Sequence, residues 1–475
     1  MVGGLLPASN IGLGVSLPCQ LGPDTCELGI KSAWPNENAL CHGIPLAFIG
    51  LGAMGMGMAT NLLKTFKVRG FDVYKPTLDK FVAAGGQAAS TPRSAVVDAK
   101  YVVVMVATAA QTLQALFDDT NGAVHELQPN ATVILCSTAY PEHVPEVRKI
   151  LDEEYNRSDV ELVDAPVSGG TIRAAQGTLT ILASGPPQSI KAARPVLEAM
   201  AEPLYVINGG LGAGTKVKMV HQALAAIHIT MASEAMGFAA FLGLNTKDAF
   251  EYLKDSPGAS WMLQNRGPHM LENNLHPFSA LNIIVKDVGI VTSGGRNADC
   301  PLFLSSAAEQ VLNSGVIAGY GLEDDSGLLR VYLPSKDGLV YEQATAPNTS
   351  SDDPKLKLVE DILAGVHLAA AVEAMVFGKK IGLDADLLYE IVKGAAGASA
   401  MFTEKVPTML GGQSNSQGSI KEVITKLKVA VEEASRLKYP LHLTATALQL
   451  FQLAAATGSA DEPDVSIAKI WDSRT

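Results

Sequence analysis

One glycine-rich segment, residues 50–55, limits what this chain can fold into more than any other feature. An apolar run typical of a buried strand, residues 44–49, comes directly before it, and a helix-forming stretch, residues 56–65, follows it. Between a strand and a helix, the first glycine permits a tight turn, the second lets a phosphate approach the backbone, and the third lets the helix pack on the strand. The segment therefore predicts a dinucleotide-binding unit. The residues that would hold the pyrophosphate are Gly50, Leu51, Gly52, Ala53, Met54 and Gly55.

An acidic residue at the end of the next predicted strand, residues 66–73, favours NAD over NADP. Asp72 lies 22 residues after Gly50. A carboxylate there can accept hydrogen bonds from the ribose hydroxyls and would repel a 2′-phosphate. Two basic residues nearby, Arg69 and Lys75, leave NADP open as an alternative. A purely structural role for Asp72 as a turn cap is the other reading.

Strand-like and helix-like segments continue to alternate over the first 200 residues. Apolar or β-branched runs at 101–106, 131–136, 161–163 and 179–183 are typical of buried strands. Strands that alternate with helices favour a mostly parallel sheet with helices on both faces. We therefore expect a Rossmann-type, doubly wound α/β domain over residues 44–207.

Composition excludes several classes of protein. The 475 residues are 47% hydrophobic and 18% charged, and the net charge is −12. A surplus of acid argues against a nucleic-acid binder and against a basic protein of the membrane surface. The five cysteines form neither a disulfide framework nor a CxxC pattern, so no metal site is predicted among them. We expect a cytoplasmic protein, with a mitochondrial location left open.

The N-terminal residues 1–43 are expected to form a weakly ordered extension. They are rich in Gly, Pro, Ser and Asn, and the first 30 contain no Lys or Arg. Secretory signals and mitochondrial presequences both need basic residues, so neither is predicted. Metal binding by Cys19, Cys26, Cys41 and His42 is the alternative role for this segment.

A long apolar run at residues 223–244 resembles a membrane span in length. It also carries His228, Thr230, Ser233 and Glu234, together with many Gly and Ala residues. Polar groups of this kind are expensive in a bilayer. The run therefore predicts a buried helix in a helical domain and no membrane partner.

Four stretches together give the chain a resemblance to the β-hydroxyacid dehydrogenase family, which includes 3-hydroxyisobutyrate, L-threonate and tartronate-semialdehyde enzymes. The likeness spans about residues 44–333 and implies an NAD-dependent oxidoreductase that acts on a small hydroxy acid. It also implies a helical substrate domain at residues 208–333 after the Rossmann domain. The four stretches are 50–64, 136–141, 164–185 and 212–222.

The resemblance assigns roles position by position. Lys218 matches the family's catalytic lysine. The residues that would bind the substrate carboxylate, through a hydroxyl and backbone N–H groups, are Ser168, Gly169 and Gly170. Further cofactor contacts would be Val106 and Ala107 on the adenosine side, Thr138 near the nicotinamide ribose, and Lys286 near the cofactor.

One departure from the family pattern points to a branch. Most members follow the catalytic lysine with Asn-Asn, whereas this chain has His221 and Gln222. These residues lie one helical turn beyond Lys218, and both side chains can hydrogen-bond a substrate hydroxyl. The pair is most similar to the L-threonate dehydrogenase branch, which favours a four-carbon polyhydroxy acid. Neutral sequence drift is the alternative explanation.

The chemistry of alcohol oxidation explains why a lysine is needed. A base about 3 Å from the hydroxyl oxygen must take its proton while a hydride leaves the carbon. A lysine, with a usual pKa of about 10.4, is neutral at working pH only if burial or a nearby positive charge lowers that pKa. Lys218 precedes a long apolar run that suits burial. Spacing alone leaves Lys216 as an alternative base, and the family alignment selects Lys218.

The rest of the chain contains an internal duplication. A shift of 139 residues without gaps places residues 218–244 on residues 357–383. The same offset extends to 258–260 on 397–399 and to 301–302 on 440–441. Identical pairs in the first segment are Lys218/Lys357, His228/His367, Glu234/Glu373, Met236/Met375, Gly243/Gly382 and Leu244/Leu383. Two tandem all-α domains are therefore predicted after the Rossmann domain.

The second copy, residues 355–475, is not expected to be a second active site. His221 and Gln222 are replaced by Glu360 and Asp361, which would repel a carboxylate substrate, and Thr425 stands at the Lys286 position. Residues 334–354 are interpreted as a polar linker. Single-copy family members bury this domain against a partner subunit, so the second copy predicts an intramolecular pseudo-dimer. A homo-oligomer also stays open.

Four alternative functions are weighed beside an NAD-dependent hydroxyacid dehydrogenase that acts on a tetronate. A 3-hydroxyisobutyrate dehydrogenase or a semialdehyde reductase would belong to the same family, although Asp72 argues against an NADPH-linked reductase. An imine reductase is disfavoured because such relatives often lack the lysine found here as Lys218. A non-catalytic NAD-binding scaffold is the alternative of another class, and the intact lysine and Ser-Gly-Gly turn argue against it.

Overall fold

The computed structural model describes residues 43–411 and 418–471. Predictions that concern residues 1–42, including the cysteines Cys19, Cys26 and Cys41, lie outside these described residues.

The first half of the chain forms the predicted Rossmann-type sheet. Six parallel strands pair in the order β3-β2-β1-β4-β5-β6, so that β1 lies at the centre beside β2 and β4. Strands β4 and β5 are buried along their whole length, as expected for β-branched runs covered on both faces. The strands are β1 (Pro45–Ile49), β2 (Lys67–Phe71), β3 (Gln87–Ala88), β4 (Tyr101–Val104), β5 (Thr132–Leu135) and β6 (Glu161–Asp164).

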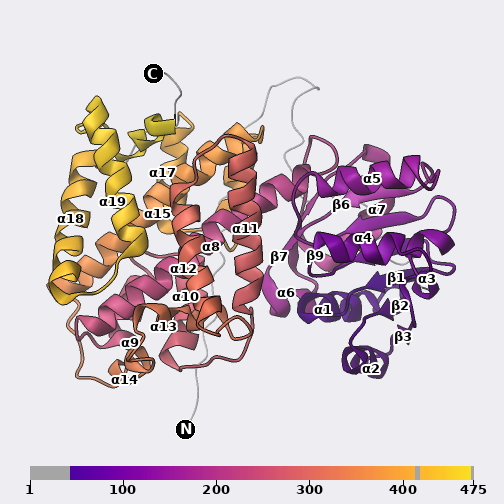
Figure 1. The fold of residues 1–475 in the computed structure, drawn as a ribbon, viewed down its shortest axis with the longest axis horizontal. Helices are drawn as coiled ribbons and strands as arrows, with labels where there is room; N and C mark the ends of the chain where they lie inside the picture. The colour runs from indigo at the N-terminus through magenta and orange to yellow at the C-terminus, as the bar shows by residue number, and fades with distance from the viewer. Residues whose placement is uncertain (1–42, 412–417, 472–475) are drawn as a thin grey trace, which may run out of the picture. The chain divides into compact units, whose positions relative to one another are not determined.

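Helices cover both faces of this sheet, which makes it doubly wound (Figure 1). Successive side chains of β1 point to opposite faces: Leu46 and Phe48 pack in a core with α1 and α7, whereas Ala47 and Ile49 pack in another with α4 and α5. The helices are α1 (Ala53–Leu62), α2 (Lys75–Ala83), α3 (Pro92–Ala95), α4 (Ala109–Phe117), α5 (His143–Glu153), α6 (Gly170–Gln176) and α7 (Pro187–Met200).

The last predicted strand, residues 179–183, belongs to a second sheet and not to the main one. It forms β8 (Leu179–Ala183), which pairs antiparallel with β7 (Val167–Ser168) and parallel with β9 (Ala201–Val206). The connection between β7 and β8 holds only the short helix α6, and a crossover to a parallel neighbour needs a dozen residues or more. The chain therefore turns back on itself here.

The first helical segment is built around α8 (Ala213–Phe241). This helix is buried along nearly its whole length, which confirms the prediction of a buried helix at 223–244. Two helices of the described residues, α8 and α15 (Pro354–Lys380), are long and apolar enough to cross a membrane, but 94% and 83% of their apolar windows are buried inside the protein. The other helices of the segment are α9 (Thr246–Leu253), α10 (Trp261–Leu271), α11 (Leu281–Asn297), α12 (Phe303–Ile317), α13 (Leu329–Tyr332) and α14 (Leu339–Gln343).

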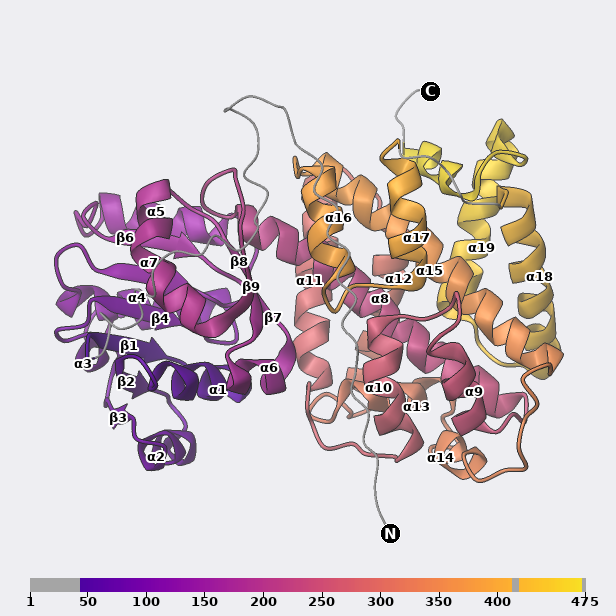
Figure 2. The same ribbon diagram turned by 180° about the vertical axis from the view of Figure 1, so that it is seen from behind.

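The second helical segment repeats the first, as the 139-residue offset predicts. Its long helix α15 packs on α8, and α16 and α17 pack in turn on α15 (Figure 2). The helices are α15 (Pro354–Lys380), α16 (Ala385–Lys393), α17 (Ala400–Met409), α18 (Ile420–Leu437) and α19 (His442–Ala454). Each of these five corresponds in order to α8, α9, α10, α11 and α12.

Contacts between the two segments are reciprocal. Glu234 of α8 accepts hydrogen bonds from the backbone N–H groups of Leu443 and Thr444, at the start of α19. In return, Glu373 of α15 accepts hydrogen bonds from the N–H groups of Leu304 and Ser305, in α12. The corresponding histidines of the two long helices, His228 and His367, lie with their ring centres 4.4 Å apart. The segments therefore exchange the same contacts in both directions.

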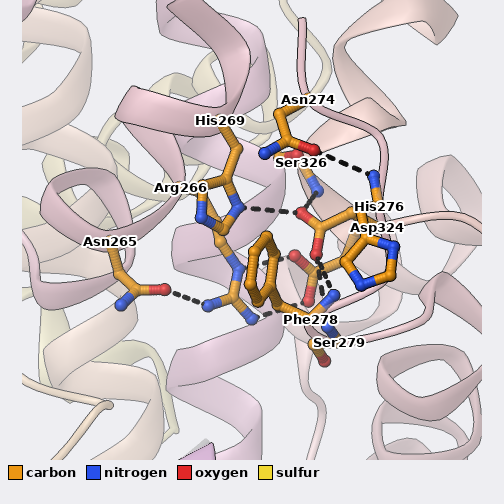
Figure 3. A network of polar contacts seen from close by, with 10 residues as sticks. Asn265, Arg266, His269, Asn274, His276, Phe278, Ser279, Asp324 and Ser326 are labelled. Carbon is orange, nitrogen blue, oxygen red and sulfur yellow. Dashed lines mark hydrogen bonds and ion pairs between the residues drawn. The ribbon is translucent and has the colours of Figure 1, made fainter. Parts of the chain in front are cut away.

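An ion pair inside each segment is duplicated as well. Arg266 binds Asp325 at 2.6 Å, and at the same offset Lys405 binds Asp464 at 2.8 Å. Beside the first pair, Asp324 accepts hydrogen bonds from the N–H groups of Phe278 and Ser279 and contacts His269 (Figure 3). These buried carboxylates hold the loop between α10 and α11.

The predicted linker, residues 334–354, is more ordered than its composition suggests. It contains α14 and docks on the start of α9, where Thr246 Oγ1 donates to the carbonyl of Val340 at 2.6 Å. Asp248 accepts a hydrogen bond from the N–H of Thr349 at 2.8 Å. Side chains in the first turn of α9 thus bind backbone groups of the linker and hold it in place.

Candidate functional site

The glycine-rich loop has the geometry that a pyrophosphate needs. Gly50 has φ +97°, and a Cβ there would lie 2.2 Å from the carbonyl oxygen of Met105. A Cβ on Gly55 would lie 2.0 Å from the carbonyl oxygen of Gly50, so both positions require glycine. Nothing lies within 4 Å of a Cβ on Gly52, which is exposed just before α1. The loop is therefore closely packed at Gly50 and Gly55 and open at Gly52, where the first N–H groups of α1 face outward.

Asp72 lies at the end of β2, beside this loop. Its carboxylate accepts hydrogen bonds from the N–H of Leu51 at 2.7 Å and from the N–H of Tyr74 at 2.8 Å. A carboxylate has lone pairs left for further donors, so these bonds orient it without using its full capacity. The residues present fit the pyrophosphate and ribose of NAD.

The two basic residues that left NADP open are engaged elsewhere. The guanidinium of Arg69 donates to backbone carbonyls in and after α3, with the shortest distance, 2.7 Å, to Val97. Lys75 pairs with Asp79 on α2 at 2.7 Å. Neither forms a cationic pocket with Asp72, which supports the preference for NAD.

The other predicted cofactor residues lie at the same edge of the sheet. The N–H of Val106, after β4, donates to Ser137 Oγ at 2.9 Å, and the N–H of Ala107 donates to Gln111 Oε1 at 2.9 Å. Thr138 follows β5, and its carbonyl accepts a hydrogen bond from Lys286 Nζ at 3.1 Å. The carboxyl ends of parallel strands meet at one edge, so these segments converge on the glycine-rich loop.

The predicted carboxylate-binding turn joins β7 to α6. Ser168 is buried in β7, opposite Thr180 of β8. Gly169 and Gly170 have φ +137° and +70°, values that residues with a Cβ rarely adopt. A Cβ on Gly170 would meet no atom within 4 Å, so the turn is open on that side.

A buried aspartate at the end of β6 fixes the start of α8. Asp164 accepts hydrogen bonds from the N–H and hydroxyl of Thr215, at 2.9 and 2.7 Å, and from the hydroxyl of Ser184. Burial raises the pKa of Asp164 to about 6. The sequence analysis gave Asp164 no role, although an acid four residues before the Ser-Gly-Gly turn is a signal visible in the sequence. The contact holds the start of α8 against the α/β domain.

Lys218 lies one turn into α8 and is 5% exposed. Burial lowers its pKa to about 8, with a smaller lowering from Lys286 that Asp287 opposes. No group among residues 43–411 and 418–471 accepts a hydrogen bond from its Nζ. The alternative base, Lys216, donates to the carbonyl of Ile381 at 3.2 Å and is held against the end of α15.

His221 and Gln222 lie one turn beyond Lys218, as predicted, but both are hydrogen-bonded within the protein. His221 Nδ1 lies 3.0 Å from Gln222 Oε1, and its Nε2 lies 3.0 Å from the N–H of Gly397. Gln222 Nε2 donates to Asp287 Oδ2. Burial, with Lys218 second, lowers the pKa of His221 to about 3. A direct substrate contact by His221 would require one of these bonds to be given up, and that contact stays a prediction.

The second copy has a different set of side chains at the equivalent place. Lys357 pairs with Glu360 and with Asp361, the latter at 3.3 Å. Tyr252 donates its hydroxyl proton to the other oxygen of Glu360 at 2.5 Å. Lys357 is therefore neutralised by acids, whereas Lys218 is not. In the part of the chain that the structure describes, no three His, Cys, Asp or Glu side chains are grouped to hold a metal ion.

Comparison with known proteins identifies the family. The family described as the NAD binding domain of 6-phosphogluconate dehydrogenase matches residues 45–210. The family described as NAD-binding of NADP-dependent 3-hydroxyisobutyrate dehydrogenase matches twice, over 212–332 and 354–471. The chain belongs to the 3-hydroxyisobutyrate dehydrogenase-like family of β-hydroxyacid dehydrogenases. The double match confirms the internal duplication.

Individual relatives place this dehydrogenase in the L-threonate branch. The L-threonate dehydrogenase of Cupriavidus necator is 38% identical, and the match covers 61% of this chain and 98% of that enzyme. A solved 3-hydroxyisobutyrate dehydrogenase from Salmonella typhimurium is 36% identical, with a TM-score of 0.57 over 60% of this chain and 99% of that one. The family member described here is an NAD-dependent dehydrogenase that acts on the CH–OH group of hydroxy acids.

A third likeness covers the second helical segment too. The 6-phosphogluconate dehydrogenase of Plasmodium falciparum is 14% identical, with a TM-score of 0.62 over 86% of this chain and 92% of that one. This similarity concerns the fold alone. It shows that an α/β domain followed by a long all-α region occurs in a second dehydrogenase.

Proposed function

We propose that this dehydrogenase oxidises a four-carbon polyhydroxy acid such as L-threonate, with Lys218 as the general acid/base. The observation that carries the proposal is a buried lysine with a lowered pKa and a free Nζ, held at the start of α8 beside the edge of the sheet. When bound, NAD supplies the hydride acceptor.

The proton step falls to Lys218. A neutral amine can take the hydroxyl proton, and a pKa of about 8 leaves a substantial neutral fraction at mildly alkaline pH. In the reductive direction the protonated amine returns the proton to the carbonyl oxygen. Burial of Lys218 keeps water from competing for its Nζ.

Substrate orientation falls to the Ser-Gly-Gly turn and to Gln222. The Ser168 hydroxyl and the N–H groups of Gly169 and Gly170 can donate to a carboxylate. Thr180 of β8 pairs with Ser168 of this turn. Two residues farther along β8, the carbonyl of Leu182 packs against Gly214 and so joins β8 to α8. Gln222 keeps one N–H and one lone pair for a substrate hydroxyl after its bonds to His221 and Asp287. The name of the Cupriavidus necator relative supports a tetronate.

Initial rates of nicotinamide reduction near pH 9 test the proposal. NAD and NADP are supplied in turn with L-threonate, D-threonate, L- and D-erythronate, 3-hydroxyisobutyrate and glycerate. We expect turnover of a tetronate with NAD. Turnover of 3-hydroxyisobutyrate alone would reject the substrate assignment and keep the lysine mechanism.

Two lysine variants test the assignment of the base. Lys218→Met keeps an unbranched side chain in the buried site but removes the amine, and the rate is expected to fall at least about a hundredfold. Lys357→Met changes the equivalent lysine of the second copy and is the matched control, with an expected rate within about twofold of the native protein. An active Lys218→Met variant would reject the mechanism.

We also propose that residues 355–471 stand in place of a partner subunit. The reciprocal bonds of Glu234 and Glu373 support this, since a two-fold related dimer makes each contact twice. The close approach of His228 and His367, which are equivalent in the duplication, is the contact expected at such an axis.

A further inference from the structure

A line of hydrogen bonds connects the second helical segment to the surroundings of Lys218. It begins at the N–H of Gly397, which donates to His221 Nε2 at 3.0 Å. It continues from His221 Nδ1 to Gln222 Oε1 at 3.0 Å and from Gln222 Nε2 to Asp287 Oδ2. Asp287 also binds Lys286 at 2.9 Å, and Lys286 reaches the carbonyl of Thr138.

The direction of each bond is fixed from both ends. A backbone N–H can only donate, so His221 Nε2 must be an acceptor. A carboxylate can only accept, so Gln222 must present its NH2 group to Asp287 and its oxygen to His221. Both conditions require the proton of the neutral imidazole on Nδ1. The N–H of Gly397 and the carboxylate of Asp287 therefore both require the same tautomer of His221.

Burial makes this arrangement costly to break. His221 is 2% exposed, Gln222 8% and Asp287 4%. A buried polar group that loses its partner has little water to replace it, and the loss costs about 1–3 kcal/mol. Flipping one member would leave a donor facing a donor or an acceptor facing an acceptor.

Gly397 is held in place by the contact between the two segments. It lies in the loop between α16 and α17, next to Ser399, which forms an antiparallel bridge with Ser260. The N–H of Trp261 donates to the carbonyl of Ala398 at 3.0 Å, and the N–H of Ala400 donates to Ala259 at 2.9 Å. A Cβ on Gly397 would lie 3.2 Å from His221 Cδ2, so the backbone approaches the ring closely.

The equivalent contact in the other direction does not reach the side chain at the His221 position, because the N–H of Gly258 donates to Ser256 Oγ in its own loop at 3.1 Å. Gly258, the counterpart of Gly397, packs against Leu363 and the carbonyl of Glu360. The Glu360 side chain is bound by Lys357 and Tyr252. The duplication has thus kept the packing of both glycine loops, and at Gly397 this packing brings a backbone donor to an imidazole beside the lysine.

We propose that the second helical segment is part of the active site, because the N–H of Gly397 sets the tautomer of His221 and thereby orients Gln222 toward Asp287. Gly397 and His221 are positioning residues in this scheme. The kinetic part of the proposal rests on the proposed function, whereas the tautomer does not.

The consequence for Lys218 follows from the charges that face it. These are Asp287 and Lys286 of α11, with neutral His221 on its own helix. Without the N–H of Gly397, His221 can carry its proton on Nε2, and its bare Nδ1 then attracts the NH2 group of Gln222. Asp287 loses a hydrogen-bond donor and attracts the proton of Lys218 more strongly. The pKa of Lys218 then rises.

Nitrogen NMR of the native full-length protein, labelled with 15N-histidine, tests the tautomer without any turnover. We expect the His221 signal, assigned by its loss in His221→Gln, to show a protonated Nδ1 and an unprotonated Nε2 throughout pH 6–9. A protonated Nε2, or rapid averaging of the two forms, would overturn the proposal. This outcome is independent of which acid the enzyme oxidises.

Two variants of Gly397 test the consequence for activity. Gly397→Pro removes the N–H, and Gly397→Ala retains it while adding a methyl group. If the pKa of Lys218 rises by about one unit, kcat/KM at pH 7 falls about tenfold and recovers at higher pH. Gly397→Ala brings its Cβ to 3.2 Å from His221 Cδ2 but keeps the N–H, so its pH midpoint should stay that of the native protein even if its rate falls. Identical pH profiles for two folded variants would overturn the proposal, and if Gly397→Pro fails to fold, the NMR measurement decides.

Discussion

At the scale of the residue, Lys218 shows how burial lowers the pKa of an ordinary side chain. An amine in water is charged at neutral pH, whereas Lys218 lies in an apolar helix with a single acid, Asp287, to offset the cost of its charge. Its counterpart Lys357 is half-exposed and bound by two acids, and its pKa is raised. The same residue type thus gains or loses the capacity for proton transfer through its neighbours alone.

The pH dependence of oxidation follows from this lysine. Only neutral Lys218 can accept the hydroxyl proton, so kcat/KM for oxidation should rise with pH and level off above about 8. His221, with a pKa of about 3, stays neutral over this range and adds no further step. Initial rates from pH 6 to 10 check this. A midpoint near the ordinary lysine value of about 10.4 would contradict the buried state of Lys218.

At the scale of the element, α8 and α15 each carry one glutamate that caps a helix of the other segment. Glu234 receives two backbone N–H groups and the Thr444 hydroxyl at the start of α19. Burial raises the pKa of both Glu234 and Glu373, so each carboxylate depends on these donors. The N-termini of α19 and α12 have no capping side chain of their own, and a glutamate of the other segment accepts hydrogen bonds from their N–H groups instead.

Removing one of these carboxylates should destabilise the protein. Glu234→Ala leaves the N–H groups of Leu443 and Thr444 buried without an acceptor, and we expect the free energy of unfolding to fall by about 2–4 kcal/mol. Urea unfolding followed by circular dichroism measures this. Glu234→Gln keeps one acceptor oxygen and should lose less. A change below about 0.5 kcal/mol in Glu234→Ala would show that the cap contributes little.

At the scale of the whole molecule, the duplication places two helical segments against each other inside one chain. Helix α8 is buried over nearly all of its 29 residues, and α15 supplies part of that cover. A single segment with this helix would expose a large apolar face, which in other proteins marks an association surface. The second copy has lost the glycine turn and the lysine environment but has kept the packing.

Deletion of residues 345–475 tests this role. Without α15 the apolar face of α8 is uncovered, so we expect the truncated chain to self-associate or precipitate, with a lower unfolding midpoint. Size-exclusion chromatography with light scattering, together with thermal unfolding, measures both properties. A soluble truncated monomer of unchanged stability would reject the pseudo-dimer.

Much of the architecture could be predicted from local pattern. The strand, the glycine-rich loop and the helix around Gly50 could be predicted because each is formed by residues that are neighbours in the chain. The 139-residue offset is visible in the sequence alone. Strand β8 was predicted but assigned to the wrong sheet, because strand pairing is a choice among distant partners. The linker helix α14 was missed because the contact that holds it joins the backbone carbonyl of Val340 to Thr246 of α9, far away in the chain.

The sequence by itself determined the class of fold and the duplication, and Asp72 favours NAD. All of these follow from residue type and spacing. Only the tertiary structure decided that Asp164 holds the start of α8, that Lys216 is tied to α15, and that Gly397 reaches His221. These contacts join residues far apart in the chain, and their partners are backbone groups that every sequence contains. No pattern of side chains points to the contacts of Lys216 and Gly397.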